Sequence, residues 1–144
     1  MTFQNPDDAA LRALLERSRR IAIVGASPRP ERPSHGVMAY LQGCGYRCIP
    51  VRPPGGEEIL GERSVASLRD LDAPPDIVDV FRAPEHVPAV VEEAIAAGAP
   101  AIWLQEGVVH PEAAERARAA GLTVVMDLCI LRVHRRLCGG ASPA

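Results

Sequence analysis

Five short, mainly apolar stretches recur along the chain and alternate with longer stretches in which apolar residues return every three or four positions. The short stretches are residues 21–24, 46–51, 76–81, 101–104 and 122–126. Stretches of this length and composition are typical of strands buried on both faces of a parallel sheet. Strands that alternate with helices predict an α/β fold, a Rossmann-like, three-layer open parallel sheet with helices on both faces.

Capping residues locate the helices between these strands. Asn5 is expected to be the N-cap of the first helix and Pro6 its first residue, with Leu11, Leu14 and Leu15 as the apolar stripe. Proline starts and glycine stops predict further helices, and the expected helices after the first are 33–43, 84–97, 111–120 and 129–137. After the second strand, a short edge strand within 59–65 and a turn of helix at 67–71 are expected.

The length of 144 residues suits one domain, residues 1–144, with a core of about residues 18–137. Residues 139–144 follow the last helix and are all small residues or proline. None of them would anchor this segment to a core, so a disordered tail is expected there. No stretch approaches the roughly 20 apolar residues of a membrane span, and the N-terminus lacks the basic and apolar regions of a signal peptide. The cytoplasm is therefore the expected location.

Charge and cysteine content exclude several classes of function. A net charge of −2 with 47% apolar residues argues against a nucleic-acid or membrane-surface partner. All sixteen basic residues are arginine, which excludes a Schiff-base lysine and the lysine of a P-loop. Cys44 and Cys48 are separated by three residues and no cluster at zinc-ligand spacing follows, so the four cysteines are expected to be reduced and no metal site is predicted.

The turn Gly25-Ala26-Ser27 closes the first strand and is the first candidate for a binding site. Ligands of open parallel sheets bind at the carboxyl ends of the strands, where the strand order reverses. A glycine lets backbone amides approach a phosphate at the start of the next helix, and Ser27 adds a hydroxyl donor. The later glycines of G-x-G-x-x-G are absent, since Ser27 and Pro30 occupy their positions, so an ordinary tight turn is the alternative. The proline-rich loop that follows carries Arg29 and Arg32, which are able to pair with phosphate.

Arg52 follows the second strand, at the position where a fold that selects NAD places an acidic residue for the ribose 2′-hydroxyl. A cation there argues against NAD. It suits instead a ribose that carries a phosphate, as in NADP or coenzyme A (CoA). An exposed arginine in a surface turn is the alternative.

The carboxyl ends of the later strands supply further candidates. Arg82 and Gln105 directly follow buried strands, and Phe81 and Trp103 offer an apolar wall, although for either aromatic side chain taken alone the sheet core is the favoured location. Cys129 begins the last helix, where it is a candidate reactive thiol or an inert buried cysteine. No histidine stands beside a serine or cysteine in a nucleophile motif, and no catalytic constellation is predicted.

In order and spacing, these residues resemble the small stand-alone CoA-binding proteins, whose domain is similar to the CoA-binding domain of succinyl-CoA synthetase α subunits and ADP-forming acyl-CoA synthetases. The likeness runs from about Ile21 to Leu137. The motifs that carry it are Val24-Gly25-Ala26-Ser27-Pro28, Arg32-Pro33-Ser34-His35, Gly45-Tyr46, Pro50-Val51-Arg52-Pro53, Asp76-Ile77-Val78-Asp79-Val80-Phe81-Arg82, Trp103-Leu104-Gln105-Glu106-Gly107 and Met126-Asp127-Leu128-Cys129.

The resemblance implies that CoA or an acyl-CoA binds over the Gly25 turn, with Ser27 and Arg32 near its phosphates. The candidate cofactor-binding residues are Gly25, Ala26, Ser27, Arg32, Ser34, Arg52, Pro53, Phe81, Arg82, Trp103, Gln105, Gly107 and Cys129. Two positions depart from the family, which usually has Asn in place of Arg52 and a basic residue in place of Leu128. The further domains that give the synthetases their ligase activity are absent from the chain, so that activity is not implied.

Three functional hypotheses follow. The first is a non-catalytic module that carries, senses or regulates CoA or acyl-CoA, with this small molecule as the expected partner. The second is an NADP-dependent oxidoreductase, which the same turn and Arg52 would also suit. The third is a thiol switch in which Cys129 forms a mixed disulfide with CoA.

Overall fold

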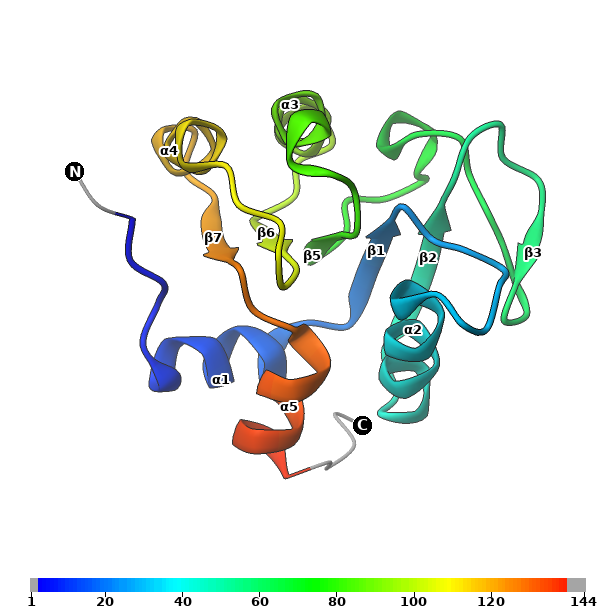
Figure 1. Ribbon diagram of the computed structural model, residues 1–144, viewed down its shortest axis with the longest axis horizontal. Helices are drawn as coiled ribbons and strands as arrows, with labels where there is room; N and C mark the ends of the chain where they lie inside the picture. The colour runs from blue at the N-terminus through cyan, green and yellow to red at the C-terminus, as the bar shows by residue number, and fades with distance from the viewer. Residues whose placement is uncertain (1–2, 140–144) are drawn as a thin grey trace.

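A five-stranded parallel sheet runs through the computed structural model, which describes residues 3–139 (Figure 1). Its spatial order is β2-β1-β5-β6-β7, and every neighbouring pair is parallel. The strands are β1 (Arg20–Val24), β2 (Arg47–Val51), β5 (Ile77–Val80), β6 (Ala101–Leu104) and β7 (Thr123–Met126). From β1 the chain adds β2 on one side of the sheet and then β5, β6 and β7 on the other. The strand order therefore reverses beside β1.

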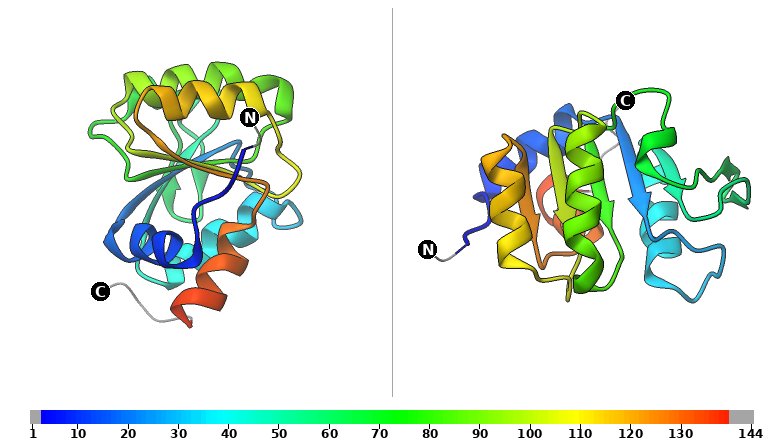
Figure 2. Two further views of the ribbon diagram at one scale, coloured as in Figure 1. Left: turned by 90° about the vertical axis from the view of Figure 1, so that its left-hand side faces the viewer. Right: turned by 90° about the horizontal axis from the view of Figure 1, so that it is seen from above.

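Helices cover both faces of the sheet, which confirms the predicted three-layer α/β fold (Figure 2). One face carries α1 (Asp8–Arg17), α2 (Pro33–Gly43) and α5 (Ile130–Cys138). The other carries α3 (Val87–Ala96), preceded by the 3₁₀ turn η2 (Pro84–His86), and α4 (Pro111–Ala119). None of the helices among residues 3–139 is long and apolar enough to cross a membrane.

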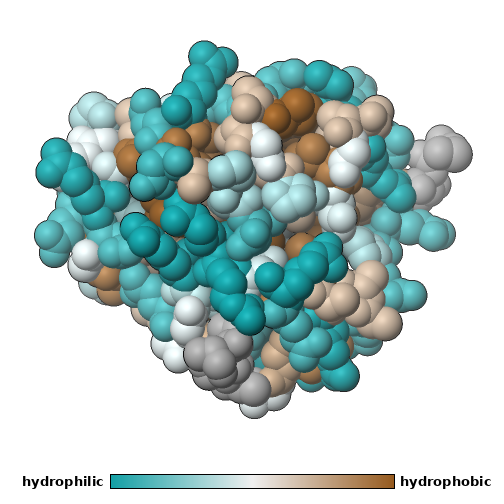
Figure 3. Space-filling view, turned by 180° about the vertical axis from the view of Figure 1, so that it is seen from behind, coloured by the Kyte–Doolittle hydropathy of each residue, from teal (hydrophilic) through white to brown (hydrophobic). Residues whose placement is uncertain are grey.

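The strands divide their side chains between two apolar clusters, one beneath each helical layer. In β5, Ile77 packs toward α1, α2 and α5, whereas Val78 and Val80 pack toward α3 and α4. All four residues of β5 and of β6 are buried. The continuous apolar stretches of the sequence therefore reflect strands that are covered on both faces. On the face seen from behind, hydrophilic and hydrophobic side chains are interspersed (Figure 3).

The start of the first helix differs from the prediction. Its N-cap is Asp7, whose carboxylate accepts a hydrogen bond from the Ala10 amide at 2.9 Å, and not Asn5. Asn5 is instead hydrogen-bonded to the backbone of Met126 on β7: its amide nitrogen donates to the carbonyl at 2.9 Å, and its amide oxygen accepts from the N–H at 2.7 Å. Both residue types are good N-caps. The bonds to the distant strand β7 occupy the Asn5 side chain, and the cap moves to Asp7.

The segment after β2 forms a separate hairpin and not a strand at the edge of the main sheet. The hairpin consists of β3 (Glu58–Ile59) and β4 (Glu62–Arg63), which pair antiparallel. Val65 then makes a single parallel bridge to Val51 of β2. The predicted turn of helix is present as the 3₁₀ turn η1 (Leu68–Asp70).

The end of α5 is closed by Gly139, which has a left-handed conformation (φ 58°) and is the C-cap of that helix. This capping role differs from the prediction that residue 139 begins the tail. Residues 140–144 of the predicted tail lie outside the described residues. The four cysteines are free, with Cys44 and Cys48 buried and Cys129 and Cys138 partly buried.

Asp79 places an ionisable group in the middle of the sheet. Its side chain is completely buried, and neither carboxylate oxygen has a hydrogen-bond partner among residues 3–139. Burial away from water disfavours the charged form and raises the pKa of Asp79 well above its usual range. The folded protein therefore keeps this proton at pH values where the unfolded chain, with an aspartate pKa of about 3.9, has released it.

We expect Asp79 to make the folded protein less stable as the pH rises above about 4, because in that range the unfolded state binds fewer protons than the folded state. The Asp79→Asn variant has no proton to lose. As the pH rises, the difference in free energy of unfolding between Asp79→Asn and the wild type, measured in urea, should therefore change in favour of the variant. The change should amount to up to about 1.4 kcal/mol per pH unit until Asp79 itself ionises in the folded wild type. Asp72→Asn, at a side chain that is 86% exposed, is the control and should follow the wild type. An Asp79→Asn curve parallel to the wild-type curve between pH 5 and 8 would contradict this account.

Candidate ligand-binding cleft

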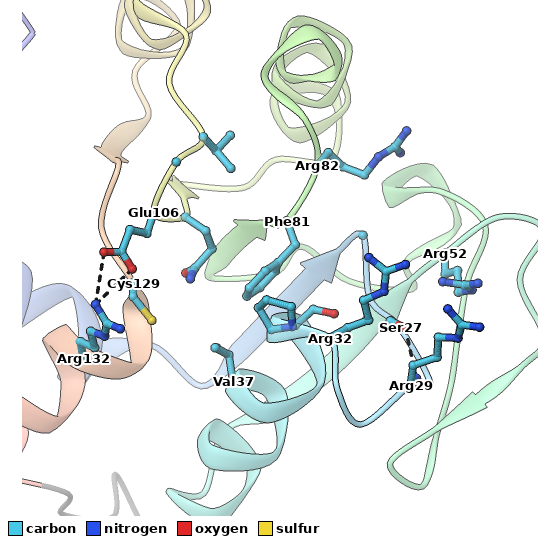
Figure 4. A pocket seen from close by; sticks show the side chains of 16 residues that line it. Ser27, Arg29, Arg32, Val37, Arg52, Phe81, Arg82, Glu106, Cys129 and Arg132 are labelled. Carbon is cyan, nitrogen blue, oxygen red and sulfur yellow. Dashed lines mark hydrogen bonds and ion pairs between the residues drawn. The ribbon is translucent and has the colours of Figure 1, made fainter.

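A cleft of about 780 Å³ opens at the carboxyl ends of the strands, beside the point where the strand order reverses (Figure 4). Its volume lies within the range of small-molecule sites, and its position is the one expected for an open parallel sheet. Residues from the loops after all five strands of the sheet and from α2 and α5 line it. Ten of the predicted site residues are brought together here: Gly25, Ser27, Arg32, Ser34, Arg52, Phe81, Arg82, Gln105, Gly107 and Cys129.

The Gly25 turn is held between the ends of β2 and β5. The Gly25 amide donates to the Val51 carbonyl at 3.1 Å, and the Phe81 amide donates to the Val24 carbonyl at 2.8 Å. Gly25 has a φ of +86°, and a Cβ built on it would lie 2.7 Å from the carbonyl oxygen of Phe81. Both the backbone conformation and the close approach therefore require glycine.

The start of α2 faces the cleft without a side-chain cap. Arg32 occupies the N-cap position and makes no capping hydrogen bond with its side chain, and Pro33 is the first helical residue. Ser27, the last residue of the Gly25 turn, accepts a hydrogen bond from the Arg29 amide at 3.1 Å through its Oγ, which joins the turn to the loop that follows. The positive end of a helix dipole favours an anion, and Arg32, Pro33 and Ser34 at this helix end line the cleft.

Four arginines, Arg29, Arg32, Arg52 and Arg82, lie around one end of the cleft (Figure 4). Arg52 donates from Nη1 to the Ala26 carbonyl at 3.1 Å and pairs through Nε with Glu57 at 3.3 Å. Among the described residues, the other three guanidiniums have no carboxylate partner within 4.0 Å. This end is therefore locally electropositive although the whole chain has a net charge of −2, and it suits a ligand with several phosphates.

The opposite end of the cleft carries Glu106, Cys129 and Arg132, with Phe81 and Val37 between the two ends (Figure 4). The Arg132 guanidinium donates to both Glu106 oxygens at 3.2 Å, and because both side chains are more than half exposed, this pair adds little to stability. The two loops at this end are joined by a hydrogen bond of 2.7 Å from the Gly107 amide to the Asp127 carboxylate.

Three predicted contacts do not line the cleft. Trp103 is completely buried in the apolar cluster beneath α1, α2 and α5, and its indole N–H donates to the Leu128 carbonyl at 2.9 Å. The Ala26 side chain is buried against the core, and Ala26 takes part in the site only through its carbonyl, which binds Arg52. Pro53 lies beyond Arg52 in the turn after β2, outside the lining residues, and its peptide bond to Pro54 is cis.

Three lining residues, Val37, Val108 and Arg132, appear neither among the candidate residues nor in the motifs that carry the resemblance. Arg132 lies three residues after Cys129, which is one helical turn, so helical spacing alone points to it once Cys129 is placed in the cleft. Val37 likewise lies three residues, or one helical turn, after Ser34 at the start of α2. Val108 follows Gly107 in an irregular loop, and no pattern in the sequence indicates it.

Comparisons with known proteins agree with this architecture. Residues 19–135 match a protein family described as CoA binding domain. The chain is 47% identical over 132 residues to the protein YneT of Bacillus subtilis (strain 168), and the alignment covers 92% of this chain and 97% of YneT. A solved structure of a hypothetical protein from Pyrococcus horikoshii OT3 is 38% identical, has a TM-score of 0.89 and matches over 96% of this chain and 100% of that one.

A larger protein has a similar fold in one part. The dinucleotide forming Acetyl-coenzyme A synthetase 1 of Ca. Korarchaeum cryptofilum is 21% identical with a TM-score of 0.70, and the match covers 81% of this chain and 28% of the synthetase. This likeness concerns the fold alone. The family match, in contrast, extends from the start of β1 through most of α5 and includes every strand of the sheet. The chain therefore belongs to the CoA binding domain family.

Proposed function

We propose that the cleft binds CoA or an acyl-CoA, with the phosphates at the arginine end and the thiol-bearing arm directed toward Cys129. The observation that carries this proposal is the group of four arginines around the Gly25 turn, in a chain of the CoA binding domain family. CoA carries a 3′-phosphate and a diphosphate at one end and a neutral arm at the other. The cleft has the same division, with cations at one end and Phe81 and Val37 leading away from them.

The proposed role is to hold this ligand, as a carrier, sensor or regulatory module, without chemical conversion. The lining residues within 3–139 include no histidine, and their one thiol is that of Cys129. The side chains of His110 and His134 are engaged elsewhere: His110 caps α4 by accepting from the Ala113 amide, and His134 is buried and hydrogen-bonded to the Tyr40 hydroxyl at 2.8 Å. The one carboxylate of the described lining, that of Glu106, is paired with Arg132, so the described lining lacks an acid and base set toward the arm.

Calorimetric titration of one preparation with CoA, dephospho-CoA, NADP and NAD tests the proposal. Saturable binding of CoA, with weaker binding of dephospho-CoA and none of NAD, is expected, because the arginine end offers cations for each phosphate. Saturable binding of NADP with none of CoA would overturn the proposal in favour of an NADP-dependent oxidoreductase, the alternative that Arg52 also suits.

Cys129 supports a second candidate function, a thiol switch. It is partly exposed and free, and it lines the end of the cleft at which the ligand thiol is proposed to lie. Its thiolate would attack the disulfide of oxidised CoA, so that a Cys129–CoA mixed disulfide forms and one CoA leaves as the thiol. Intact-mass analysis after exposure to CoA disulfide should then show one CoA adduct that is absent from Cys129→Ser. An unmodified wild-type protein would exclude the switch.

A further inference from the structure

Gln105 is a polar side chain at the end of β6 that lines the cleft although its exposed fraction is only 6%. Its Oε1 accepts a hydrogen bond of 3.1 Å from the Ile130 amide at the start of α5. A backbone N–H is able only to donate, so this bond fixes which end of the side-chain amide carries oxygen and which carries nitrogen. Gln105 therefore has a determined orientation in the cleft wall.

The other end of this amide is left with two N–H donors. Among residues 3–139, no acceptor lies within hydrogen-bond distance of the Gln105 Nε2. Gln105 Nε2 is not one of the side-chain atoms that are both buried and without a partner, so this nitrogen reaches the open cleft although most of the side chain is buried. A donor that is oriented by one bond and lacks a partner in the wall of a cleft is well placed to receive an acceptor from a ligand.

The place of Gln105 in the cleft indicates which part of a ligand it meets. It precedes Glu106 in the chain, and its bond partner Ile130 follows Cys129. Glu106 and Cys129 lie at the end of the cleft away from the arginines (Figure 4). The phosphate-bearing part of the ligand faces the arginines, so the arm that carries the thiol faces Gln105. The arm's hydroxyl lies toward the diphosphate, so the acceptors nearer the thiol are the carbonyl oxygens of its two amides and, in an acyl-CoA, that of the thioester.

We propose that Gln105 is a specificity-determining residue that donates a hydrogen bond from Nε2 to a carbonyl oxygen on the thiol-bearing arm of the ligand. This inference rests on the proposed binding of CoA or acyl-CoA. It adds the chemical feature that the far end of the cleft recognises, which is a carbonyl group and not the thiol or an anion. An amide carbonyl of the arm and the thioester carbonyl are the two sources of this acceptor.

The variant Gln105→Glu tests the donor alone. The glutamate retains an oxygen for the Ile130 amide and presents a second oxygen where the wild type presents Nε2–H. Affinity for a ligand whose carbonyl meets Gln105 should fall roughly tenfold, since two acceptors then face each other. Gln105→Met, which is similar in volume but has neither polar group, should also bind more weakly and serves if the buried glutamate prevents folding.

Four ligands are titrated into each variant: CoA, acetyl-CoA, S-ethyl-CoA, which is a thioether without the thioester carbonyl, and 3′-phospho-ADP, which lacks the arm. Unchanged affinity for 3′-phospho-ADP shows that the variant is folded and that the arginine end is intact. A loss for the three arm-bearing ligands alike assigns the bond to an amide carbonyl of the arm. A loss for acetyl-CoA alone assigns it to the thioester.

Two results would overturn the inference. If wild type binds CoA and both Gln105 variants bind every arm-bearing ligand equally well, Gln105 does not recognise a carbonyl, and the proposed function stands without it. An equal loss for 3′-phospho-ADP has the same meaning, because the effect would then not involve the arm. If the wild type binds none of the four ligands, the proposed function fails and this inference fails with it.

Discussion

Replacing Gly25 with alanine should lower the free energy of unfolding by about 3 kcal/mol and weaken CoA binding at least tenfold. Two costs combine at this residue. A φ of +86° is unfavourable for a residue with a Cβ, by roughly 1–2 kcal/mol. The new Cβ would also lie 2.7 Å from the Phe81 carbonyl oxygen, which belongs to backbone and has little room to move. Relief of this contact displaces the turn from the end of β5 and disturbs the phosphate end of the cleft.

Gly61→Ala is the matched control for this substitution. Gly61 has a φ of +82°, close to that of Gly25, but a Cβ there meets no atom within 4 Å. It connects β3 and β4, away from the cleft lining. Urea unfolding should therefore show only the conformational cost of roughly 1–2 kcal/mol, with CoA affinity unchanged. Equal losses of stability in the two variants would show that the contact with Phe81 has no energetic effect.

Arg52→Glu should weaken the binding of CoA by roughly 10- to 100-fold and that of dephospho-CoA by only a few-fold. The reason is the position of Arg52 after β2, where a ribose-linked phosphate is expected to lie in this fold. The substitution removes a charge-assisted donor to that phosphate and places a carboxylate in front of it. The smaller loss for dephospho-CoA reflects the bond from Arg52 to the Ala26 carbonyl, which supports the Gly25 turn for every ligand. Calorimetry with both ligands measures the difference.

The control for this charge reversal is Arg47→Glu, which makes the same change in net charge at an exposed residue at the other end of β2. It should leave both affinities nearly unchanged at physiological ionic strength, because a charge so far from the ligand is screened. Glu57→Gln adds a second comparison, since it releases Arg52 from its ion pair and should not weaken CoA. Equal losses of CoA and dephospho-CoA in Arg52→Glu would mean that Arg52 does not contact the 3′-phosphate.

The sheet and most of the helices were predictable because their signals are local. Strands such as Ile77–Val80 are buried on both faces and leave a continuous apolar stretch in the sequence. Proline at the start of α2 and of α4 and glycine after their ends mark these helices without any knowledge of the rest of the chain. The general place of the site then follows, because it depends only on the ends of the strands.

Features that depend on distant contacts were not predictable in this way. Asn5 and Asp7 are both good N-caps, and only the bonds between Asn5 and Met126 decide between them. Trp103 is buried below the cleft, whereas Gln105, two residues later, lies in the cleft wall. This difference depends on where β6 ends. Arg132 becomes predictable only after Cys129 has been placed in the cleft, because helical spacing then puts it one turn further along α5.

The two hydrogen bonds between Asn5 and Met126 span 121 residues of sequence. On a ribosome that adds about 5–20 residues per second, roughly 6–24 s pass between the synthesis of the two partners. The ion pair between Asp8 of α1 and Arg136 of α5 spans a still longer separation of 128 residues. The segment that carries Asn5 and Asp8 is synthesised well before its partners, so its contacts are completed only after β7 and α5 have been made.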